Sequence, residues 1–357
     1  MNNLFIQEFR QMSLNKAVLD IRNRQRIKPS PSNEPAAAWT GKDVLGTGQI
    51  DTITIIFKTS GCWWGKAGGC TMCGYVYDSA QTVPSDDDLM AQLSRAMRKA
   101  SNFDRFMVKI FTSGSFLDTK EIPLEVRHKI LAGLDADERI VKVLAETRPE
   151  FITEENVKDC VSTLKNTDFE VATGLETSSD SIRKQSINKG FTFKNFTDAA
   201  TVARANGATV KSYLMLKPLF LSEKEALEDI VKTVHDAAQY SDTFSINLCN
   251  VQRGTYVEYL WERKQYRPPW LWSIVEILKR TKEEFPDMII TSDPVGAGSK
   301  RGPRNCRQCS HAVADAIRLF SLTQDLSCFD HLSCDCKDLW EQVLELDDHT
   351  FGSPITD

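Results

Sequence analysis

The alternation of short apolar strands with helical stretches is the feature that most constrains the fold of this chain. From residue 51 onward, apolar runs recur, and stretches typical of helices, such as residues 86–100 and 223–239, separate them. The expected strands are 52–57, 106–111, 140–145, 169–174, 209–216 and 244–249, with 288–291 as a candidate seventh. Strands separated by helices form right-handed βαβ units in a parallel sheet that is buried on both faces. The pattern therefore predicts an α/β fold.

The number of units limits the architecture. Six units are fewer than the eight of a closed TIM barrel, so an open partial (β/α)6 barrel and a doubly wound sheet both fit. The chain has 357 residues, which is enough for one large domain or two ordinary ones. We expect an N-terminal extension over residues 1–50, with a helix through Arg26 followed by a proline-rich stretch. The core domain is then 51–295, and 296–357 form an appended Cys-rich module.

Composition excludes several classes of protein. The formal net charge is −5, with 41% hydrophobic and 26% charged residues, as in ordinary globular proteins, so the global charge identifies no partner. No apolar run approaches the roughly 18–20 residues of a membrane span, and polar residues come too early for a signal peptide. We therefore expect a cytoplasmic protein. Its ten cysteines then point to metal binding or catalysis rather than to disulfides.

Three cysteines follow the first expected strand directly. The segment TSGCWWGKAGGCTMCGY holds Cys62, Cys70 and Cys73 on a glycine-rich loop, with seven and then two residues between them. Glycines let such a loop wrap tightly and bring backbone N–H groups close to cluster sulfides. A zinc knuckle is the alternative, but closed zinc sites take four protein ligands. A 4Fe-4S cluster held by three cysteines leaves one iron open, which is a catalytic feature.

A second group of cysteines lies near the C-terminus. Five of them fall between residues 306 and 336, and we expect a four-thiolate site made by Cys306, Cys309, Cys334 and Cys336. Zinc is the ion expected at such a site. Cys328, His311 or His331 could replace one of the four ligands. An auxiliary iron-sulfur cluster is the alternative to zinc. The surrounding residues 296–311 contain no acid and four bases, which predict a phosphate-binding patch: Lys300, Arg301, Arg304 and Arg307.

Two further segments have an open interpretation. Lys211, Tyr213 and Lys217 fall on one face of the strand at 209–216, which predicts a face toward an anionic ligand, with an exposed edge strand as the alternative. The block 250–272 interleaves basic and aromatic residues, a pattern that suits unpaired bases and phosphates. Its tryptophans, Trp270 and Trp272, have the spacing of ordinary core residues.

The three-cysteine loop at the end of the first strand resembles that of radical S-adenosylmethionine (SAM) enzymes, with the widened spacing of the elongator catalytic-subunit-like branch. Further strings narrow the match: ETRPEFIT at 146–153, GLETSSDSIRKQSINKGFT at 174–192, KPLFLSEKEA at 217–226, YRPPWLW at 266–272 and RGPRNCRQC at 301–309. Together they are similar to the RaSEA family, the archaeal radical SAM subunits of archaeosine synthesis in tRNA. The resemblance extends from about residue 36 to 340.

The resemblance implies a cofactor set and its contacts. Cys62, Cys70 and Cys73 would hold a 4Fe-4S cluster that cleaves SAM reductively and needs an electron donor. Backbone groups at Thr112, Ser113 and Gly114 would hold the SAM amino group, although the acidic residue usual in this turn is missing. The remaining SAM contacts implied by the family are Glu146, Arg148, Glu176, Ser178 and Lys189.

The resemblance also implies a reaction and a partner. The tRNA lysine-transferring archaeosine synthase subunit would attach lysine to the nitrile of a 7-cyano-7-deazaguanine base in the tRNA D-arm. The present chain would then cleave a lysine carbon-nitrogen bond and leave the formamidino group. A radical SAM acyl- or methylthio-transferase acting on tRNA is one rival, but neither an acetyltransferase-like domain nor an extra N-terminal iron-sulfur domain is visible. A zinc-dependent RNA-binding protein without catalysis is the other rival.

Overall fold

The computed structural model describes residues 13–25 and 30–346. The strands are β1 Ala37–Leu45, β2 Gly48–Phe57, β3 Phe106–Thr112, β4 Ile140–Glu146, β5 Asp168–Glu176, β6 Thr209–Leu216, β7 Thr243–Leu248 and β8 Ile289–Thr291. The helices are α2 Leu14–Asn23, α3 Trp63–Lys66, α4 Asp86–Met97, α5 Leu124–Asp135, α6 Glu154–Thr163, α7 Asp180–Ile182, α8 Phe193–Ala205, α9 Glu223–Ala237, α10 Tyr256–Glu262, α11 Leu271–Glu284, α12 Ser310–Thr323 and α13 Cys336–Leu346. None of the described helices combines the length and the apolar character that a membrane crossing requires.

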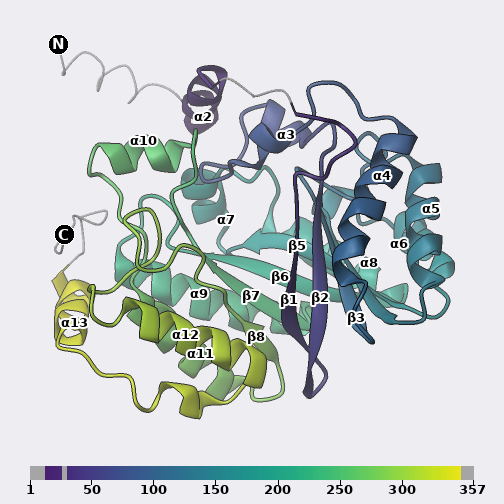
Figure 1. Cartoon of the computed structure of the whole chain (residues 1–357). Coiled ribbons are helices and arrows are strands. Elements are labelled where there is room, and N and C mark those ends of the chain that lie inside the picture. Colours follow the sequence, from purple (N-terminus) through teal and green to yellow (C-terminus); the bar gives the residue numbers. More distant parts are fainter. Residues whose placement is uncertain (1–12, 26–29, 347–357) are drawn as a thin grey trace.

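All eight strands form one sheet whose spatial order follows the sequence, from β1 to β8. The β1–β2 pair is antiparallel, and every later pair is parallel. A doubly wound sheet reverses its strand order at a switch point, whereas this sheet does not. The partial barrel is therefore confirmed, and the candidate strand at 288–291 is present as β8. Figure 1 shows the sheet curving between α4 and α5 at one end and α9, α11 and α12 at the other.

The N-terminal part of the sheet differs from the sequence-based expectation. The segment 37–45 was expected to be part of an extension, yet it forms the edge strand β1. A two-residue turn, with Gly46 at φ +61°, connects it to β2, so the expected boundary at residue 50 falls inside β2. Gly41, Lys42 and Asp43 interrupt the apolar pattern in β1, which is why periodicity missed it. Within the described residues, the expected N-terminal helix corresponds to α2, which ends at Asn23, whereas residues 1–12 and Arg26 lie outside the described part of the chain.

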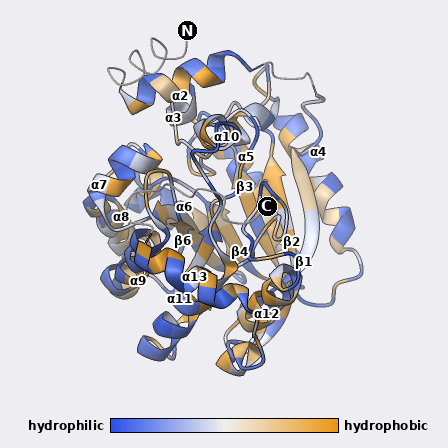
Figure 2. Cartoon of the chain, turned by 90° about the vertical axis from the view of Figure 1, so that its left-hand side faces the viewer, coloured by the Kyte–Doolittle hydropathy of each residue, from blue (hydrophilic) through white to orange (hydrophobic). Residues whose placement is uncertain are grey.

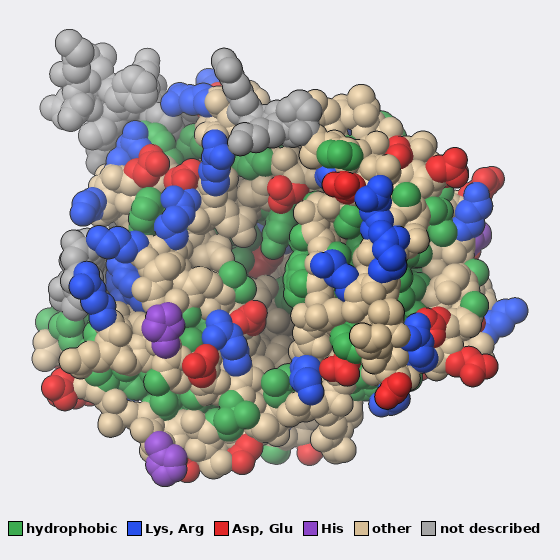
Figure 3. Space-filling model, viewed as in Figure 1, with side chains coloured by type: hydrophobic (Ala, Val, Ile, Leu, Met, Phe, Trp, Pro, Cys, Tyr) green, Lys and Arg blue, Asp and Glu red, His purple; other side chains and the backbone are tan. Residues whose placement is uncertain are grey.

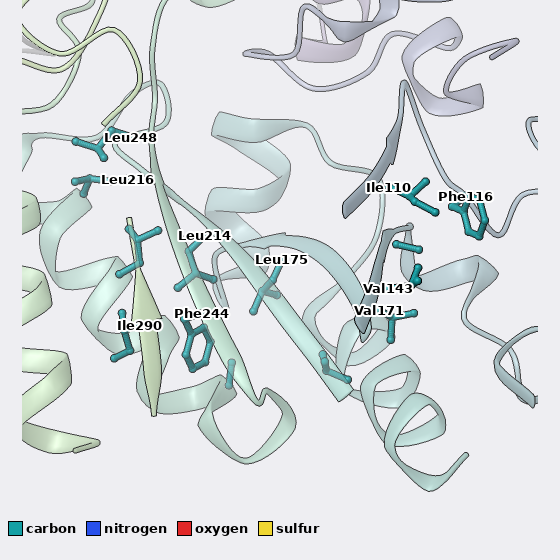
Figure 4. Packing of buried hydrophobic residues seen from close by; sticks show 14 of the residues in the cluster. Ile110, Phe116, Val143, Val171, Leu175, Leu214, Leu216, Phe244, Leu248 and Ile290 are labelled. Carbon is teal, nitrogen blue, oxygen red and sulfur yellow. The ribbon is translucent and has the colours of Figure 1, made fainter. Parts of the chain in front are cut away.

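The principal core lies between the sheet and the helices around it. Side chains such as Ile110, Val143, Leu214 and Phe244 point from the strands into this layer (Figure 4). Apolar side chains of α12 and α13, including Phe320, belong to the same buried cluster, so residues 296–346 pack into the core of the barrel. Figure 2 shows the hydrophobic strands inside and hydrophilic outer faces on several helices. The inner face of the curved sheet carries a smaller apolar cluster, which includes Met107 and Leu144, beside charged groups.

A buried group of charges occupies the inner face. Asp43 of β1 forms ion pairs with Lys109 of β3 and, at 3.4 Å, with Lys211 of β6. Burial alone would raise the pKa of Asp43, but Lys211 and Lys109 hold it well below its usual range. The anion that Lys211 needs is therefore this carboxylate and neither SAM nor substrate, which corrects one sequence-based prediction.

Removing this carboxylate should destabilise the whole sheet. Asp43→Asn leaves two buried ammonium groups without their partner, and we expect a loss of about 3–5 kcal/mol in the free energy of unfolding. Urea denaturation of the protein checks this. Asp51→Asn, in the neighbouring strand and without an ion pair among the described residues, is the matched control. Equal stability of the two variants would contradict the role assigned to Asp43.

Candidate cofactor site and metal centre

The three-cysteine loop begins directly after β2. Cys62 caps the single turn α3, and the Gly65 N–H donates to its Sγ at 3.4 Å. Gly68 and Gly69 adopt φ values of +131° and +84°, which allow the chain to turn back toward Cys70. All three thiols are half-buried and line one cavity. Burial raises the pKa of Cys62, and burial with the neighbouring Cys70 raises the pKa of Cys73 to about 11.

An arginine from α2 holds this loop in place. The Arg22 guanidinium, which is buried, donates to the carbonyl oxygens of Gly65 at 2.7 Å, Cys70 at 3.0 Å and Cys73 at 3.1 Å. Gly69 permits this approach because a Cβ there would lie 2.6 Å from Arg22 Nη1. Sequence reasoning missed Arg22, since a lone arginine in a helix carries no signal of what it will contact.

The cavity has a volume of about 430 Å³ and lies at the carboxyl ends of the parallel strands. Figure 3 shows the molecule hollowed near the centre of the view. Among the predicted cofactor contacts, most line it together with the three cysteines: Thr112, Ser113, Gly114, Glu146, Arg148, Glu176 and Lys189. The ends of β3, β4 and β5 thus bring the predicted residues to one place, as expected for a partial barrel.

Unpartnered polar atoms mark the cavity as a ligand site. The Ser113 and Thr147 hydroxyls and Nη2 of Arg148 are buried, line the cavity and make no hydrogen bond within the described chain. Buried polar groups without partners are costly, so an open set of donors and acceptors fits a polar ligand. A ligand with carboxylate, amino and hydroxyl groups, such as SAM, satisfies this set, and three thiols beside it fit a cluster with one open iron.

A close approach fixes the position of the β3 turn. A Cβ at Gly114 would lie 2.0 Å from Glu121 Oε1 and 2.7 Å from Cys62 Cα. Only glycine therefore fits between the cysteine loop and the Glu121 carboxyl, which accepts from the Ser115 N–H at 2.8 Å. Burial raises the pKa of Glu121. An acidic side chain is thus present at this turn, although it comes seven residues after Gly114 in the sequence.

Charged side chains line the other wall. Lys189 Nζ lies 2.6 Å from Glu176 Oε1, and Glu176 has φ +65°, a strained conformation of the kind that occurs at functional sites. Arg148 donates from Nε to Glu150 at 2.6 Å and from Nη1 to the Lys189 carbonyl at 3.1 Å. The charges of this wall are thus fixed relative to one another before any ligand binds.

Glu146 differs from these residues because its carboxylate has no hydrogen-bond or ion-pair partner among the described residues. Burial raises its pKa to about 7, with Glu176 and Glu121 contributing and Lys189 opposing. A carboxyl with this pKa exchanges a proton near neutral pH. The cavity therefore offers one titratable group that a substrate can use.

Two predicted residues lie elsewhere. Ser178 donates to Asp236 of α9 at 2.7 Å and does not line the cavity. Lys217 is buried in an ion pair with Glu223 at 2.7 Å, outside the cavity, while Tyr213 of the same strand lines it. The chain leaves the strand geometry at Lys217, where φ is +58°, so the expected alternation ends there.

The C-terminal cysteines meet as predicted. The Sγ atoms of Cys306, Cys309, Cys334 and Cys336 all lie within 4.8 Å of one another. Neighbouring Sγ–Sγ distances are 3.7, 3.5 and 3.5 Å, close to the edge of about 3.8 Å of a thiolate tetrahedron around one zinc ion with 2.3 Å bonds. Trp272 donates to Cys336 at 3.4 Å, whereas Cys328 lies 3.5 Å from the Thr323 hydroxyl and outside the group.

In the two basic segments, residues 296–311 and 250–272, some of the basic and aromatic side chains are engaged in contacts within the protein. Arg301 pairs with Glu258 at 2.6 Å, whereas Lys300 and Arg307 are exposed. In the block 250–272, Trp270 and Trp272 are buried in the core, as their spacing predicts. The local charge counted from the sequence is therefore reduced by an acid from α10.

A partial barrel with three cysteines on the loop after its first parallel strand, beside a cavity of unpartnered polar groups, defines a protein of the radical SAM class. Among solved structures, the Elp3 of Methanocaldococcus infernus aligns over 65% of this chain and 58% of its own, with a TM-score of 0.48 and 16% identity. Methylornithine synthase aligns over 92% and 90%, with a TM-score of 0.45 and 12% identity. No family model matches the chain.

Curated relatives identify the family within this class. The archaeosine synthase subunit beta of Methanosarcina acetivorans is 63% identical over 346 residues, which cover 97% of this chain and 100% of the relative. The protein of the same name from Thermococcus kodakarensis is 42% identical over 86% of this chain and 96% of its own. The chain belongs to the archaeosine synthase subunit beta family, and the resemblance noted in the sequence is confirmed.

Replacing Arg22 tests the support of the cysteine loop. Because a single charged hydrogen bond contributes about 1.5–3 kcal/mol, Arg22→Ala should make a reconstituted cluster lose iron to a chelator roughly tenfold faster or more. Arg22→Lys, with one ammonium for three carbonyls, should be intermediate. Arg24→Ala, at the exposed residue that directly follows α2, is the control. Identical rates of iron loss in all variants would show that α2 does not support the loop.

Proposed function

We propose that this chain is the radical SAM subunit that completes archaeosine in tRNA by cleaving a carbon-nitrogen bond of a lysine-modified 7-deazaguanine base. The observation that carries the proposal is the cavity in which three thiols lie beside unpartnered polar atoms of the residues that directly follow β3 and β4. The name of the 63% identical relative, archaeosine synthase subunit beta, supports the pathway. In this proposal the barrel from β1 to β8, together with α2, carries this chemistry, and residues 296–346 serve as a structural module packed against it.

The residues have separable roles in this proposal. Cys62, Cys70 and Cys73 hold a 4Fe-4S cluster, while Ser113, Gly114, Arg148, Glu176 and Lys189 bind and orient SAM. When bound and reduced by an electron donor, the cluster and SAM supply a radical that removes one hydrogen atom from the substrate. The half-buried position of the thiols restricts water at the cluster, and the fixed Glu176–Lys189 pair orients the cofactor.

The lysine carbon beside the amidine nitrogen is the position we assign to hydrogen abstraction. It is not acidic, so no side chain of the cavity can deprotonate it. Loss of a hydrogen atom there leaves a carbon radical. Transfer of one electron from this radical to an acceptor, a role that the oxidised cluster could fill, would give a carbon-nitrogen double bond. Addition of water would then break the carbon-nitrogen bond, with an aldehyde on the lysine chain and the formamidino group on the base as the two products. Glu146, whose pKa is about 7, can hold or release the proton that the departing group requires.

The substrate requires two partners. The tRNA lysine-transferring subunit supplies the lysine adduct, and the word subunit in the relatives' names supports a joint assembly. Lys300 and Arg307 are the exposed bases that we assign to tRNA phosphates, with Arg304 beside them, while Arg301 is held by Glu258. The cavity then receives the modified base.

Zinc is the ion that we assign to the C-terminal cysteines. Four thiolates with neighbouring Sγ atoms 3.5–3.7 Å apart enclose the space of a single ion. A four-iron cube places iron and sulfide between the thiolates and therefore needs a wider arrangement. The site joins the start of α12 to the start of α13, so its function is structural.

Isotope transfer tests the reaction directly. With lysine deuterated at the carbon beside its side-chain nitrogen, deuterium should appear in 5′-deoxyadenosine, measured by mass spectrometry, as archaeosine forms. Cys70→Ala should abolish both products because the cluster is lost. Cys160→Ala, buried in α6 away from the cavity, should retain cluster iron. Archaeosine formation without deuterium transfer would place the abstraction at another carbon.

Metal analysis tests the second site. The purified protein should contain one zinc in addition to the cluster iron, and Cys306→Ala should remove the zinc and lower the melting temperature. Zinc binding at closed sites contributes on the order of 10 kcal/mol, so the effect on soluble yield should be large. Cys328→Ala, outside the tetrad, should change neither zinc nor stability. Eight irons and no zinc per chain would replace zinc with an auxiliary cluster.

A further inference from the structure

Two aromatic side chains remain exposed where the cavity opens. Trp39 of β1 is 49% exposed and Tyr75, two residues after Cys73, is 45% exposed, yet both line the cavity that contains the three thiols. Exposed tryptophan and tyrosine are typical of surfaces that bind flat ligands, because their faces gain stacking contacts on binding. The family's cofactor contacts lie on β3, β4 and β5, so these two residues have no assigned ligand.

The direction of Trp39 follows from the strand that carries it. Side chains alternate along β1, so Trp39 shares a face with Asp43, and Asp43 lies inside the barrel in its ion pairs with Lys109 and Lys211. Gly41 stands between them on that face and contributes no side chain. Trp39 therefore faces the cavity, and it is exposed because the cavity is open there.

Two amides complete the site from the other end of the sheet. Asn247 of β7 and Asn250 just after it line the same cavity, are half-buried, and make no side-chain hydrogen bond to any described residue. In the strand order, β7 lies six positions from β1, so these amides and Trp39 belong to opposite ends of the curved sheet. Asparagine amides offer a donor and an acceptor to the edge of a base.

We propose that Trp39 stacks on the extruded 7-deazaguanine base of the tRNA substrate while Asn247 and Asn250 hydrogen-bond to its edge. The inference deepens the proposed function and rests on it. A base within folded tRNA cannot reach the thiols inside the barrel, so it must leave its stack, and the binding site must replace the lost stacking. An indole face from β1 does so, and the lysine chain of the base then points toward the cluster end of the cavity.

A comparison of two tRNAs tests this inference without turnover. Affinity is measured, in the absence of SAM and reductant, for tRNA carrying the lysine-modified base and for the same tRNA with guanine at that position. The wild-type protein should prefer the modified tRNA. Stacking of one base on an aromatic ring changes affinity by roughly 5- to 150-fold, so Trp39→Ala should reduce the preference by a factor in this range. Trp39→Phe should retain most of it.

Matched variants distinguish the outcomes. Asn250→Ala should reduce the preference several-fold, whereas Phe220→Ala, an exposed aromatic residue that does not line the cavity, should leave it unchanged. If the wild-type preference persists in Trp39→Ala, or if both tRNAs weaken equally, the stacking role is wrong while the proposed function stands. If wild-type protein neither prefers nor consumes the modified tRNA, the proposed function itself is wrong.

Discussion

The ion pairs of Asp43 hold together strands that lie far apart in the sheet. Asp43 is on the edge strand β1, and its lysine partners are on β3 and β6, two and five positions away. A flat sheet with strands about 4.8 Å apart would separate β1 and β6 by more than 20 Å, so these contacts require a strongly curved sheet. Curvature brings the carboxyl ends of the parallel strands together, and the cofactor site depends on that convergence. It also directs Trp39 inward.

The site itself combines groups fixed by the sheet with groups fixed by a loop. Glu146, Arg148 and Glu176 are positioned by strand ends, whose backbone hydrogen bonds leave little freedom. The cysteine loop has no such ladder, and it depends on Arg22 for contacts to three of its carbonyl oxygens. A guanidinium suits this task because its planar donors diverge toward several acceptors at once. The N-terminal helix is thus part of the support of the candidate cofactor site.

Sequence patterns predicted the features that have local signals. The strands β2 to β8 are apolar runs, and the cysteines of both groups have the spacing of ligands. The fold and the four-thiolate group that includes Cys306 could therefore be predicted from the sequence. Features that depend on contacts between distant parts of the sequence could not be predicted in this way. The edge strand β1 has a mixed composition and was not predicted. The carboxylate that pairs with Lys211 lies on this strand, so that ion pair was not predicted either. Ser178 donates a hydrogen bond to Asp236 of α9, a contact that no local pattern indicates. No periodicity encodes which residue of a strand end turns inward.

The opening of the cavity past Trp39 and Tyr75 has a consequence for the maturation of the protein. The cysteines that would hold the cluster line the same cavity as these two aromatic residues, and the strands that complete its walls are synthesised long after the cysteine loop. If the cluster is inserted after the barrel has folded, iron and sulfide have to enter through this opening. Under the proposed function, a scaffold protein that delivers them would approach the same face as the tRNA, so that cluster assembly, and repair after damage by oxygen, would compete with binding of the nucleic acid.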